Sequence, residues 1–426
     1  MTDAGPVRLV NIVGAAEGAD WFAPMCAGLA ARGHDVRAII DARPGAIGAQ
    51  LAQAGIPVDR LDLSLSRPLA AARGPARGAL DASRLARAAG RVTGVLRRVR
   101  PDVVLTHHFN ATLLGRLAGA AAGVPLRLSM APSPFTLEAP VTRALDRATW
   151  RANHVVIAGS ERVRSLYEAI GVPRSRLEVV YYGAPAERFD PRGADRAATR
   201  ARLGVPAYAP LIGHVAHFYA PIGGRFAPPA ARGRGVKGHE VLLRALPAVL
   251  AERPDARLVC AGGARGAPAQ RYRERIGQLA EALGVAHAVD LLDERDDVPQ
   301  LLGALDVSVQ PSLAENLGGT IESLLMAAPT VASRVGGMPE AVRHEETGLL
   351  VAPDRPDELA AAIARLLAAP DLAARLGRQG RELMLQRFTF ERTVADLDGI
   401  IRARHAERRG TGRRAAALPE KSAFQP

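Results

Sequence analysis

The feature that most constrains the fold of this 426-residue chain is an alternation of short β-branched runs with longer Ala/Leu-rich stretches of helical periodicity. Helical patterns such as 21–32 and 111–122 separate runs that are typical of strands. The first six predicted strands are at 7–13, 36–40, 103–106, 126–130, 154–157 and 177–180. Strands that alternate with helices form parallel sheets, because each helix returns the chain across the sheet. The first part of the chain is therefore predicted to be an α/β domain.

The alternation stops at 189–208, a polar stretch rich in Pro and Gly, and then starts again. The second set of predicted strands is at 211–216, 257–261, 288–292, 307–310, 330–333 and 349–351. Two successive units of similar size predict an α/β protein with two Rossmann-like, doubly wound domains, 1–200 and 207–385, that face each other across a cleft. A helix at about 388–405 is expected to pack back on the first domain. The basic residues 406–426 are expected to form a disordered tail.

Charge and cysteine content exclude several classes of protein. The net charge of +13 comes from dispersed arginines, and aromatic residues make up only 4%, so the pattern does not indicate nucleic-acid binding. Two cysteines, Cys26 and Cys260, exclude a disulfide framework or a cysteine zinc site and favour a reducing compartment. The N-terminus lacks the basic region of a signal peptide, and no apolar run reaches the roughly 18–20 residues that span a bilayer. We therefore expect a cytoplasmic protein.

The segment 81–100 has the pattern of a basic amphipathic helix. Its apolar face consists of Leu85, Val92, Leu96 and Val99. Its basic face consists of Arg84, Arg87, Arg91 and Arg98. Such a helix can dock on anionic lipid, which would place the protein at the inner face of a membrane. The alternative is a helix that packs in the protein and leaves its arginines in solvent.

The stretch 311–351 carries the strongest chemical signal of the chain. Two carboxylates, Glu315 and Glu322, bracket the pair Gly318-Gly319 at the predicted start of a helix, and a second pair, Gly336-Gly337, follows a strand. Glycines let a ligand approach the backbone, and N–H groups at the start of a helix attract anions. Carboxylates accept hydrogen bonds from paired hydroxyls. This combination predicts a site for a phosphate and several sugar hydroxyls.

The same stretch resembles the retaining glycosyltransferases with the GT-B fold, of the group 1 type. The resemblance lies in an ordered series along this stretch: Pro311-Ser312, Glu315, Gly318, Glu322 and Gly336-Gly337-Met338-Pro339-Glu340. It implies a donor domain in the second half of the chain, with a nucleotide-diphosphate sugar as co-substrate and no cofactor or metal ion. One departure is that six residues separate the two glutamates, where most relatives have seven.

By this resemblance, each part of the stretch has an expected role. Glu322 is expected to accept hydrogen bonds from the donor ribose, and Glu315 to face the transferred sugar as a catalytic residue. The backbone of Leu317, Gly318 and Gly319 is expected to contact sugar hydroxyls and the distal phosphate, and Thr320 to add a hydroxyl. The simpler alternative is that both glutamates are ordinary acids in the first turn of a helix.

The departing nucleotide diphosphate needs cations, and the resemblance implies where they lie. Lys237 is expected to be the catalytic lysine. His217 stands where relatives have an arginine, and Arg234, or Arg225 in the same loop, is the expected replacement. Arg295 belongs to the run 291–298, which is similar to the loop beside the nucleobase in relatives. For each arginine of the Gly/Pro/Arg-rich loop 221–236, the alternative is a solvated basic side chain.

The first domain carries weaker signals. Gly14 and Gly18 follow the first predicted strand, where relatives have a turn close to the donor phosphate. His107 and His108 end another strand, and His107 is the slightly favoured candidate for a catalytic histidine near the acceptor. The run Met130–Pro134 replaces a His-Gly turn of relatives, which indicates a divergent acceptor pocket. The residues 160–162 match a turn that relatives have on the hinge side.

The resulting prediction is a metal-independent, retaining glycosyltransferase. Its acceptor would be a small molecule or a lipid-linked one, as in envelope carbohydrate or natural product biosynthesis. Two alternatives remain open at this point. One is a nucleotide-sugar epimerase or hydrolase with the same fold, which would need no acceptor. The other is a catalytically silent partner protein, which the histidine at 217 and the shortened glutamate spacing would motivate.

Overall fold

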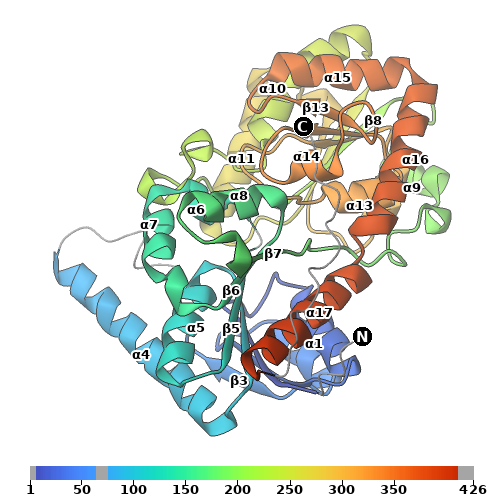
Figure 1. Ribbon diagram of the computed structural model, residues 1–426. Coiled ribbons are helices and arrows are strands. Elements are labelled where there is room, and N and C mark those ends of the chain that lie inside the picture. The colour runs from blue at the N-terminus through green and yellow to red at the C-terminus, as the bar shows by residue number, and fades with distance from the viewer. Residues whose placement is uncertain (1–5, 64–74, 132, 411–426) are drawn as a thin grey trace.

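Two parallel β-sheets form the framework of the computed structural model, which describes residues 6–63, 75–131 and 133–410 (Figure 1). The first sheet has the order β3-β2-β1-β4-β5-β6-β7. Its strands are β1 (Arg8–Val13), β2 (Asp35–Asp41), β3 (Val58–Leu61), β4 (Val103–His107), β5 (Leu126–Ala131), β6 (Val155–Ala158) and β7 (Leu177–Val179). Its helices are α1 (Phe22–Ala31), α2 (Ile47–Gln53), α4 (Pro75–Val99), α5 (Phe109–Ala121), α6 (Phe135–Glu138), α7 (Pro140–Thr149) and α8 (Glu161–Ala169).

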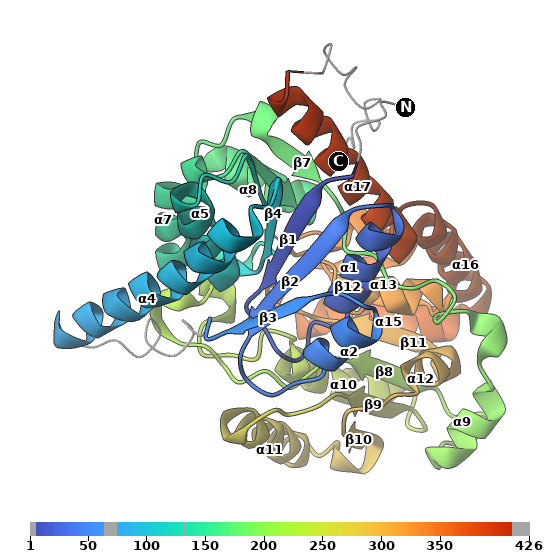
Figure 2. The ribbon, with the colours of Figure 1, turned by 90° about the horizontal axis from the view of Figure 1, so that it is seen from below.

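The second sheet has the order β10-β9-β8-β11-β12-β13. Its strands are β8 (Leu211–Val215), β9 (Arg257–Ala261), β10 (Val289–Leu292), β11 (Val307–Gln310), β12 (Thr330–Ser333) and β13 (Leu349–Val351). Its helices are α9 (Arg196–Arg202), α10 (His239–Glu252), α11 (Ala267–Ala282), α12 (Val298–Ala304), α13 (Thr320–Leu325), α14 (Met338–Ala341), α15 (Pro356–Ala368) and α16 (Pro370–Arg387). Figure 2 shows this domain behind the first one.

The observed architecture confirms the predicted fold class of two doubly wound α/β domains. Every pairing within the two sheets is parallel, for example β1 with β4 and β8 with β11. Helices cover both faces of each sheet, so β1 is buried over 9–13. The sequence prediction missed β3, whose four residues include Asp59 and Arg60, because a short charged edge strand lacks an apolar run. In each sheet the order reverses beside the first strand, which is where doubly wound sheets bind ligands.

The last helix, α17 (Phe390–Arg408), leaves the second domain and packs on α1 of the first (Figure 1). A Cβ added at Gly28 of α1 would lie 2.9 Å from Val394 Cγ1, so the two helices are in close contact. The helix continues beyond 406, which corrects the predicted start of the disordered tail. Residues 411–426 of that predicted tail lie outside the described part of the chain.

The chain crosses between the domains twice, after β7 and before α17, and the two crossings lie side by side. Ala184 N–H donates to Phe388 O at 3.1 Å, and Phe390 N–H donates to Ala184 O at 3.0 Å. Gly183 N–H donates to Thr393 Oγ1 at 2.8 Å. A Cβ at Gly183 would lie 2.2 Å from the carbonyl oxygen of Thr389, so a larger residue would separate the crossings.

The helix α4 contains the segment that suggested contact with lipid. Val92 and Leu96 are buried, and Leu85 and Val99 pack against the same core with α5. Within the described side chains of 83–100, the face that remains exposed is largely arginine. The alternative of a packed helix with a solvated basic face therefore accounts for α4 from Leu85 onward. None of the helices in the described residues is long and apolar enough to span a membrane.

A buried ion pair between α5 and α7 generates a prediction about stability. Arg116 and Asp146 are in contact, with only 1% and 2% of their side chains exposed, and Tyr167 OH donates to Asp146 Oδ2 at 2.9 Å. Asp146→Ala would leave the guanidinium buried without its counter-charge, which costs about 3–5 kcal/mol. Urea unfolding followed by circular dichroism measures this loss.

The control is Asp35→Ala, which removes an exposed carboxylate of the same domain and should change the unfolding free energy by less than about 0.5 kcal/mol. The double variant Arg116→Met/Asp146→Leu removes both charges and should recover much of the stability. Equal stability of the Asp146→Ala and Asp35→Ala proteins would contradict this account.

Candidate active site between the two domains

An ion pair between Lys237 and Glu315 lies at the carboxyl end of β11. Lys237 precedes α10, and Glu315 lies in the loop between β11 and α13. The Lys237 ammonium contacts Glu315 Oε2, with 17% and 16% of the two side chains exposed. Gly238 makes this approach possible: its φ is 78°, and a Cβ there would lie 1.9 Å from Pro311 O. The structure thus brings together two of the three predicted catalytic residues.

Lys237 stays cationic in this setting. Burial acts to lower the pKa of Lys237, but the attraction to the Glu315 carboxylate outweighs it and the pKa lies above the usual 10.5. The ring of Tyr219 adds to this environment, because the ammonium lies 5.8 Å from the ring centroid. A fixed cation at this point can stabilise a phosphate without a metal ion.

The loop between β11 and α13 buries several polar side chains without a protein partner. In the described residues, hydrogen-bond partners are absent for Gln310 Nε2, Ser312 Oγ, Asn316 Oδ1 and Thr320 Oγ1, all of which are buried. Most buried polar groups of native proteins are hydrogen-bonded, and those that are not call for an explanation such as a ligand. Two of these groups lie in the loop itself, one ends β11 and one begins α13, and their concentration around one loop indicates a site for a polar ligand.

The backbone of this loop runs close to its own carboxylate. Gly318 has φ 49°, a conformation that favours glycine, and Glu315 Oε2 would be 3.1 Å from a Cβ there. Gly319 lies against Val215 O at the end of β8. The Leu317 side chain is buried in the core, which leaves its backbone as the part that a ligand could contact. Asn316 N–H donates to Glu315 Oε1 at 3.0 Å, so the carboxylate is bonded to the loop as well as to Lys237.

Glu322 lies in the first turn of α13, half-buried, and within the electrostatic reach of the same lysine. Burial raises its pKa above the usual 4.5, while Arg188 and Lys237 act in the opposite direction. Its carboxylate makes no hydrogen bond or ion pair within the described part of the chain. A carboxylate that is desolvated and unpaired is ready to accept hydrogen bonds from hydroxyl groups.

The glycine turn after β1 faces the second domain through an arginine that the sequence reasoning missed. A Cβ at Gly18, which has φ 73°, would lie 3.3 Å from a guanidinium nitrogen of Arg265. Arg265 pairs with Glu294 at 2.7 Å in its own domain and with Glu17 at 3.8 Å in the first domain. Arg265 follows β9 at its carboxyl end, and that position was the signal that could have identified it.

Gly14 lies on the other side of this turn, against α5. A Cβ added there would lie 3.6 Å from Ala111 N, so the turn packs on the first turn of that helix. The two histidines precede the same helix. His107 is fully buried, and its Nδ1 lies 2.9 Å from Tyr182 OH. His108 is half-buried and has φ 65°. Burial lowers the pKa of both histidines, which favours neutral rings. His108 is therefore the more accessible of the two, contrary to the slight preference for His107.

His217 follows β8 and lies near the acid that Arg265 holds. A Cβ at Gly263 would lie 3.4 Å from His217 Nδ1 and 2.8 Å from Glu294 Oε2, so both groups flank this glycine. The His217 ring centroid is 5.8 Å from that of Tyr219, which in turn faces Lys237. His217 thus lies between Arg265 and Lys237, in a series of neighbouring polar side chains.

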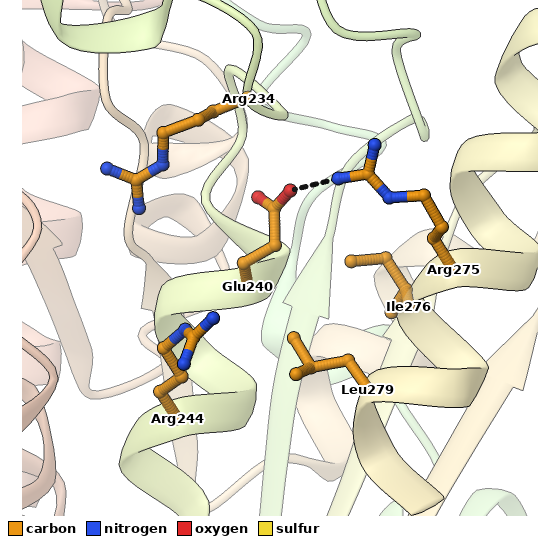
Figure 3. Close-up of a pocket in the computed structure, with 6 residues that line it drawn as sticks. All are labelled: Arg234, Glu240, Arg244, Arg275, Ile276 and Leu279. Atoms are coloured by element: carbon orange, nitrogen blue, oxygen red, sulfur yellow. Dashed lines mark ion pairs between the residues drawn. The ribbon is translucent and has the colours of Figure 1, made fainter. Parts of the chain in front are cut away.

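Arg234 and Arg295 are engaged elsewhere. The Arg234 guanidinium forms two hydrogen bonds of 2.6 Å with Asp354 and lines a separate pocket with Glu240, Arg244 and Arg275 (Figure 3). Arg295 forms two hydrogen bonds with Asp297, at 2.7 and 2.6 Å. Two-point pairing of this kind orients an arginine toward its carboxylate, because two parallel N–H donors of the guanidinium are used together. The structure therefore does not support Arg234 as the phosphate cation, and it leaves Arg295 committed to its neighbour.

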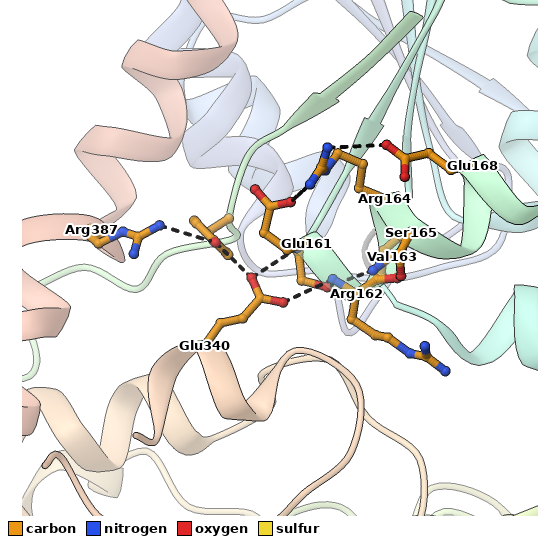
Figure 4. Close-up of polar contacts among 10 residues, drawn as sticks. Glu161, Arg162, Val163, Arg164, Ser165, Glu168, Glu340 and Arg387 are labelled. Atoms are coloured by element: carbon orange, nitrogen blue, oxygen red, sulfur yellow. Dashed lines mark hydrogen bonds and ion pairs between the residues drawn. The ribbon is translucent and has the colours of Figure 1, made fainter. Parts of the chain in front are cut away.

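Glu340 joins the two domains by capping α8 (Figure 4). Its carboxylate accepts hydrogen bonds from Glu161 N–H at 2.9 Å and Arg162 N–H at 3.1 Å, and Tyr181 OH donates to it at 2.7 Å. Ser160 Oγ accepts from Val163 N–H at 3.2 Å. The first three N–H groups of α8 are thus satisfied, two of them by the other domain. The turn 160–162 is in this way tied to the same glycine-rich stretch that carries Glu315.

A second contact places that stretch against the first domain. Asn316 Nδ2 donates to Gly159 O at 2.9 Å, and a Cβ at Gly337 would lie 2.8 Å from Ser160 Cβ. Gly336, which has φ 53°, is packed so closely that a Cβ would lie 1.6 Å from Glu315 O. The position of Glu315 therefore depends on backbone contacts that only glycine permits at this point.

Comparison with known proteins identifies the family. The model of the glycosyl transferase 4-like domain matches residues 21–183, and that of glycosyl transferases group 1 matches 224–383. The D-inositol 3-phosphate glycosyltransferase of Acidothermus cellulolyticus is 33% identical over 328 residues, which are 72% of this chain and 68% of that relative. The chain belongs to the group 1 glycosyltransferases. A further group 1 relative, of the same name and from Saccharomonospora viridis, is 31% identical and covers 73% of this chain and 72% of its own length.

Solved structures show the fold of this group 1 glycosyltransferase. Alr3699/HepE of Anabaena, in complex with UDP and glucose, superposes with a TM-score of 0.73 at 20% identity and covers 93% of this chain and 99% of its own. Sucrose-phosphate synthase of Thermosynechococcus elongatus gives a TM-score of 0.74 at 20% identity, and covers 94% and 100%. The arrangement of the two domains is the GT-B fold, as the sequence predicted.

The cap on α8 predicts an effect on the contact between the domains. Burial raises the pKa of Glu340, although the N–H of Glu161 and the hydroxyl of Tyr181 act against this. Glu340→Ala leaves two N–H groups of α8 without acceptors, at a cost of about 1–3 kcal/mol to the domain contact. Hydrogen exchange at the amides of Glu161 and Arg162 should become faster, and small-angle scattering should show a larger radius of gyration.

Glu281→Ala is the control, because Glu281 is an exposed acid of α11. Its exchange rates and radius of gyration should equal those of the unmodified protein. If Glu340→Ala also leaves both measurements unchanged, Glu340 does not hold the domains together.

Proposed function

We propose that this protein is a retaining, metal-independent glycosyltransferase that uses a nucleotide-diphosphate sugar as donor. The carrying observation is the pairing of Lys237 with Glu315 beside a group of buried polar atoms. These atoms and the Glu322 carboxylate in the first turn of α13 have no partner among the described residues. These are the parts that a phosphate, a sugar and a ribose require. The Anabaena protein, which has the same fold, is described in complex with UDP-glucose, which supports the choice of donor.

Each group has a role in this proposal. Lys237 neutralises the diphosphate as it leaves, and Glu315 holds the ammonium in place and faces the sugar ring. The backbone of the loop at Gly318 and Gly319 approaches the sugar and the distal phosphate. Glu322 accepts hydrogen bonds from the ribose. Thr320 supplies a buried hydroxyl that has no hydrogen-bond partner among the described residues.

The reaction exchanges one bond to the anomeric carbon for another. The bond from that carbon to the diphosphate oxygen breaks, and a bond to the acceptor oxygen forms on the same face of the sugar, so that the configuration is retained. The leaving diphosphate takes the proton of the acceptor hydroxyl. In this proposal His108, the more accessible of the two histidines, which follows β4, orients the acceptor. The relatives named D-inositol 3-phosphate glycosyltransferases make an inositol phosphate the first acceptor to test.

The roles of Lys237 and Glu322 predict different kinetic defects. Glu322→Ala removes a charged acceptor from the ribose and should raise the KM for the donor by roughly ten- to a hundredfold. Lys237→Ala removes the charge that stabilises the leaving group and should lower kcat by about a hundredfold or more. Nucleotide release from a panel of nucleotide sugars, with and without acceptors, measures both effects.

Arg271→Ala is the matched control, since Arg271 is an exposed cation of α11 whose side chain forms no hydrogen bond or ion pair with the described residues. If Lys237→Ala and Glu322→Ala both leave the kinetics unchanged, the assignment of the site is wrong. Turnover without any acceptor would favour a hydrolase or epimerase instead. Activity in EDTA and the anomeric coupling of the product in proton spectra test the absence of a metal and the retention of configuration.

The raised pKa of Glu322 predicts how donor affinity depends on pH. Only the ionised carboxylate is an acceptor at both oxygens, and burial makes it protonate at a pH above the usual 4.5. The affinity for UDP-glucose should therefore fall as pH decreases from 8 through this raised pKa. Glu322→Gln should bind more weakly at pH 8 and lose less affinity on acidification. Calorimetric titrations at several pH values measure both curves, and parallel curves would contradict the role of Glu322.

A further inference from the structure

A second pocket lies between the domains, beside the loop that carries Glu315. It has a volume of ≈ 570 Å³. The first domain contributes α6, α7 and α8, and the second contributes the ends of β12 and β13 and the loop 221–236. The volume falls in the range of sites that bind small molecules. Two residues that the resemblance singled out, Arg162 and Gly336, line this pocket, and the predicted catalytic and donor-binding residues are not among those that line it.

The long loop 221–236 forms one wall of the pocket and is ordered. It contains two turns of 3-10 helix, Gly224–Phe226 and Pro229–Ala231, and the first of them contacts α7 of the other domain. Ala227 and Ala231 are buried, which anchors the loop on both sides of Pro228 and Pro229. Prolines have a fixed φ and no N–H group, so they present a rigid and apolar wall.

The rest of the wall combines apolar side chains with arginines. Leu137 and Leu313, one from each domain, line the pocket and are buried, and Phe135 of α6 packs on the core of the second domain. These contacts hold the two halves of the pocket together. The lining is therefore suited to a ligand with a partly apolar body.

The charged side chains of the pocket carry a net charge of +2. They are Arg143, Arg162, Arg334 and Glu138. Glu138 lies 3.7 Å from Arg162, and burial raises its pKa while Arg162 acts to lower it. Arg143 and Arg334 have exposed guanidinium groups that form no hydrogen bond or ion pair with the described residues. Two unpaired arginines from different domains, at the edge of one pocket, are an arrangement that recognises an anionic group.

The pocket shares a wall with the proposed donor site. Gly336 lines the pocket, and its backbone lies directly against Glu315 O. A ligand held there would lie beside the loop that carries the sugar-facing carboxylate. We propose that the pocket anchors the acceptor, an amphiphilic molecule with an anionic group such as a phosphate, and this inference rests on the proposed transfer reaction. Arg143 and Arg334 bind the anionic group, and the proline-rich loop covers the apolar part.

The test is a calorimetric titration of the full-length protein with n-hexyl phosphate, without any donor. Neutral hexyl glucoside and inorganic phosphate are the comparison probes, because each has only one of the two features. Hexyl phosphate should bind at least about tenfold more tightly than either, since charge-assisted hydrogen bonds and apolar contact both contribute. Equal binding of hexyl glucoside would overturn the recognition of an anion, and equal binding of inorganic phosphate would overturn the apolar part.

Variants with opposite expected effects on the affinity for hexyl phosphate distinguish the loss of a contact from a general loss of folding. Arg143→Gln/Arg334→Gln should weaken hexyl phosphate by about tenfold or more. Glu138→Gln removes the one acid of the pocket and should strengthen binding, which an unfolded protein could not do. Arg271→Gln, the exposed arginine of α11, should change nothing. Unaltered binding in the double arginine variant would overturn the assignment.

A kinetic measurement separates this inference from the proposed function. Hexyl phosphate should compete with the acceptor and not with the nucleotide sugar, and the double arginine variant should raise the KM for the acceptor at unchanged acceptor-independent hydrolysis of the donor. Inhibition that does not compete with the acceptor would overturn the role in acceptor binding. Absence of transfer in the unmodified protein would instead refute the proposed function, whereas the titrations would still decide whether the pocket takes an anion.

Discussion

The ion pair between Lys237 and Glu315 is the interaction on which the rest of the site depends. It fixes the loop after β11 against the turn before α10, and Gly238 and Gly318 provide the space for that approach. The lysine keeps its charge in a largely buried position, because the Glu315 carboxylate beside it outweighs the effect of burial on the lysine pKa. A buried pair of this kind adds little net stability, since desolvation offsets much of its attraction. Its contribution is that the Lys237 ammonium is already in position before a ligand binds, and a preorganised cation is what stabilises a departing diphosphate.

The contact between the domains and the arrangement of the site use the same short stretch of chain. Asn316 and Glu340 bond to the first domain, while Gly336 supports the carbonyl of Glu315 from behind. Moving one domain therefore moves the backbone around the proposed donor loop. On the other side, Arg265 pairs with an acid in each domain. A change in the relative position of the domains therefore also changes the geometry of the site.

Much of the fold was predictable from the sequence, whereas only part of the site was. The alternation of apolar runs and helical stretches is a local property, so it located the strands except β3, whose charged residues hide it. The series from Pro311 to Glu340 pointed to the glutamates and glycines because these residues lie close together along the chain in a recognisable order. Partners across the domains leave no such local trace. The sequence does not show that Arg234 pairs with Asp354. The contact of Arg265 with Glu17 and the cap that Glu340 forms on α8 each join residues of different domains, so neither follows from a local pattern.

The two side-by-side crossings between the domains also determine how these domains can move. A single connecting strand acts as a swivel and permits rotation about its own direction. Here Ala184 is bonded to the chain on both sides of Thr389, and Gly183 keeps the two strands in contact. A pair of strands joined in this way resists twisting and leaves bending as the soft motion. The domains should therefore open by a hinge motion about these crossings, and the separation between the domains should increase most at the edge farthest from them.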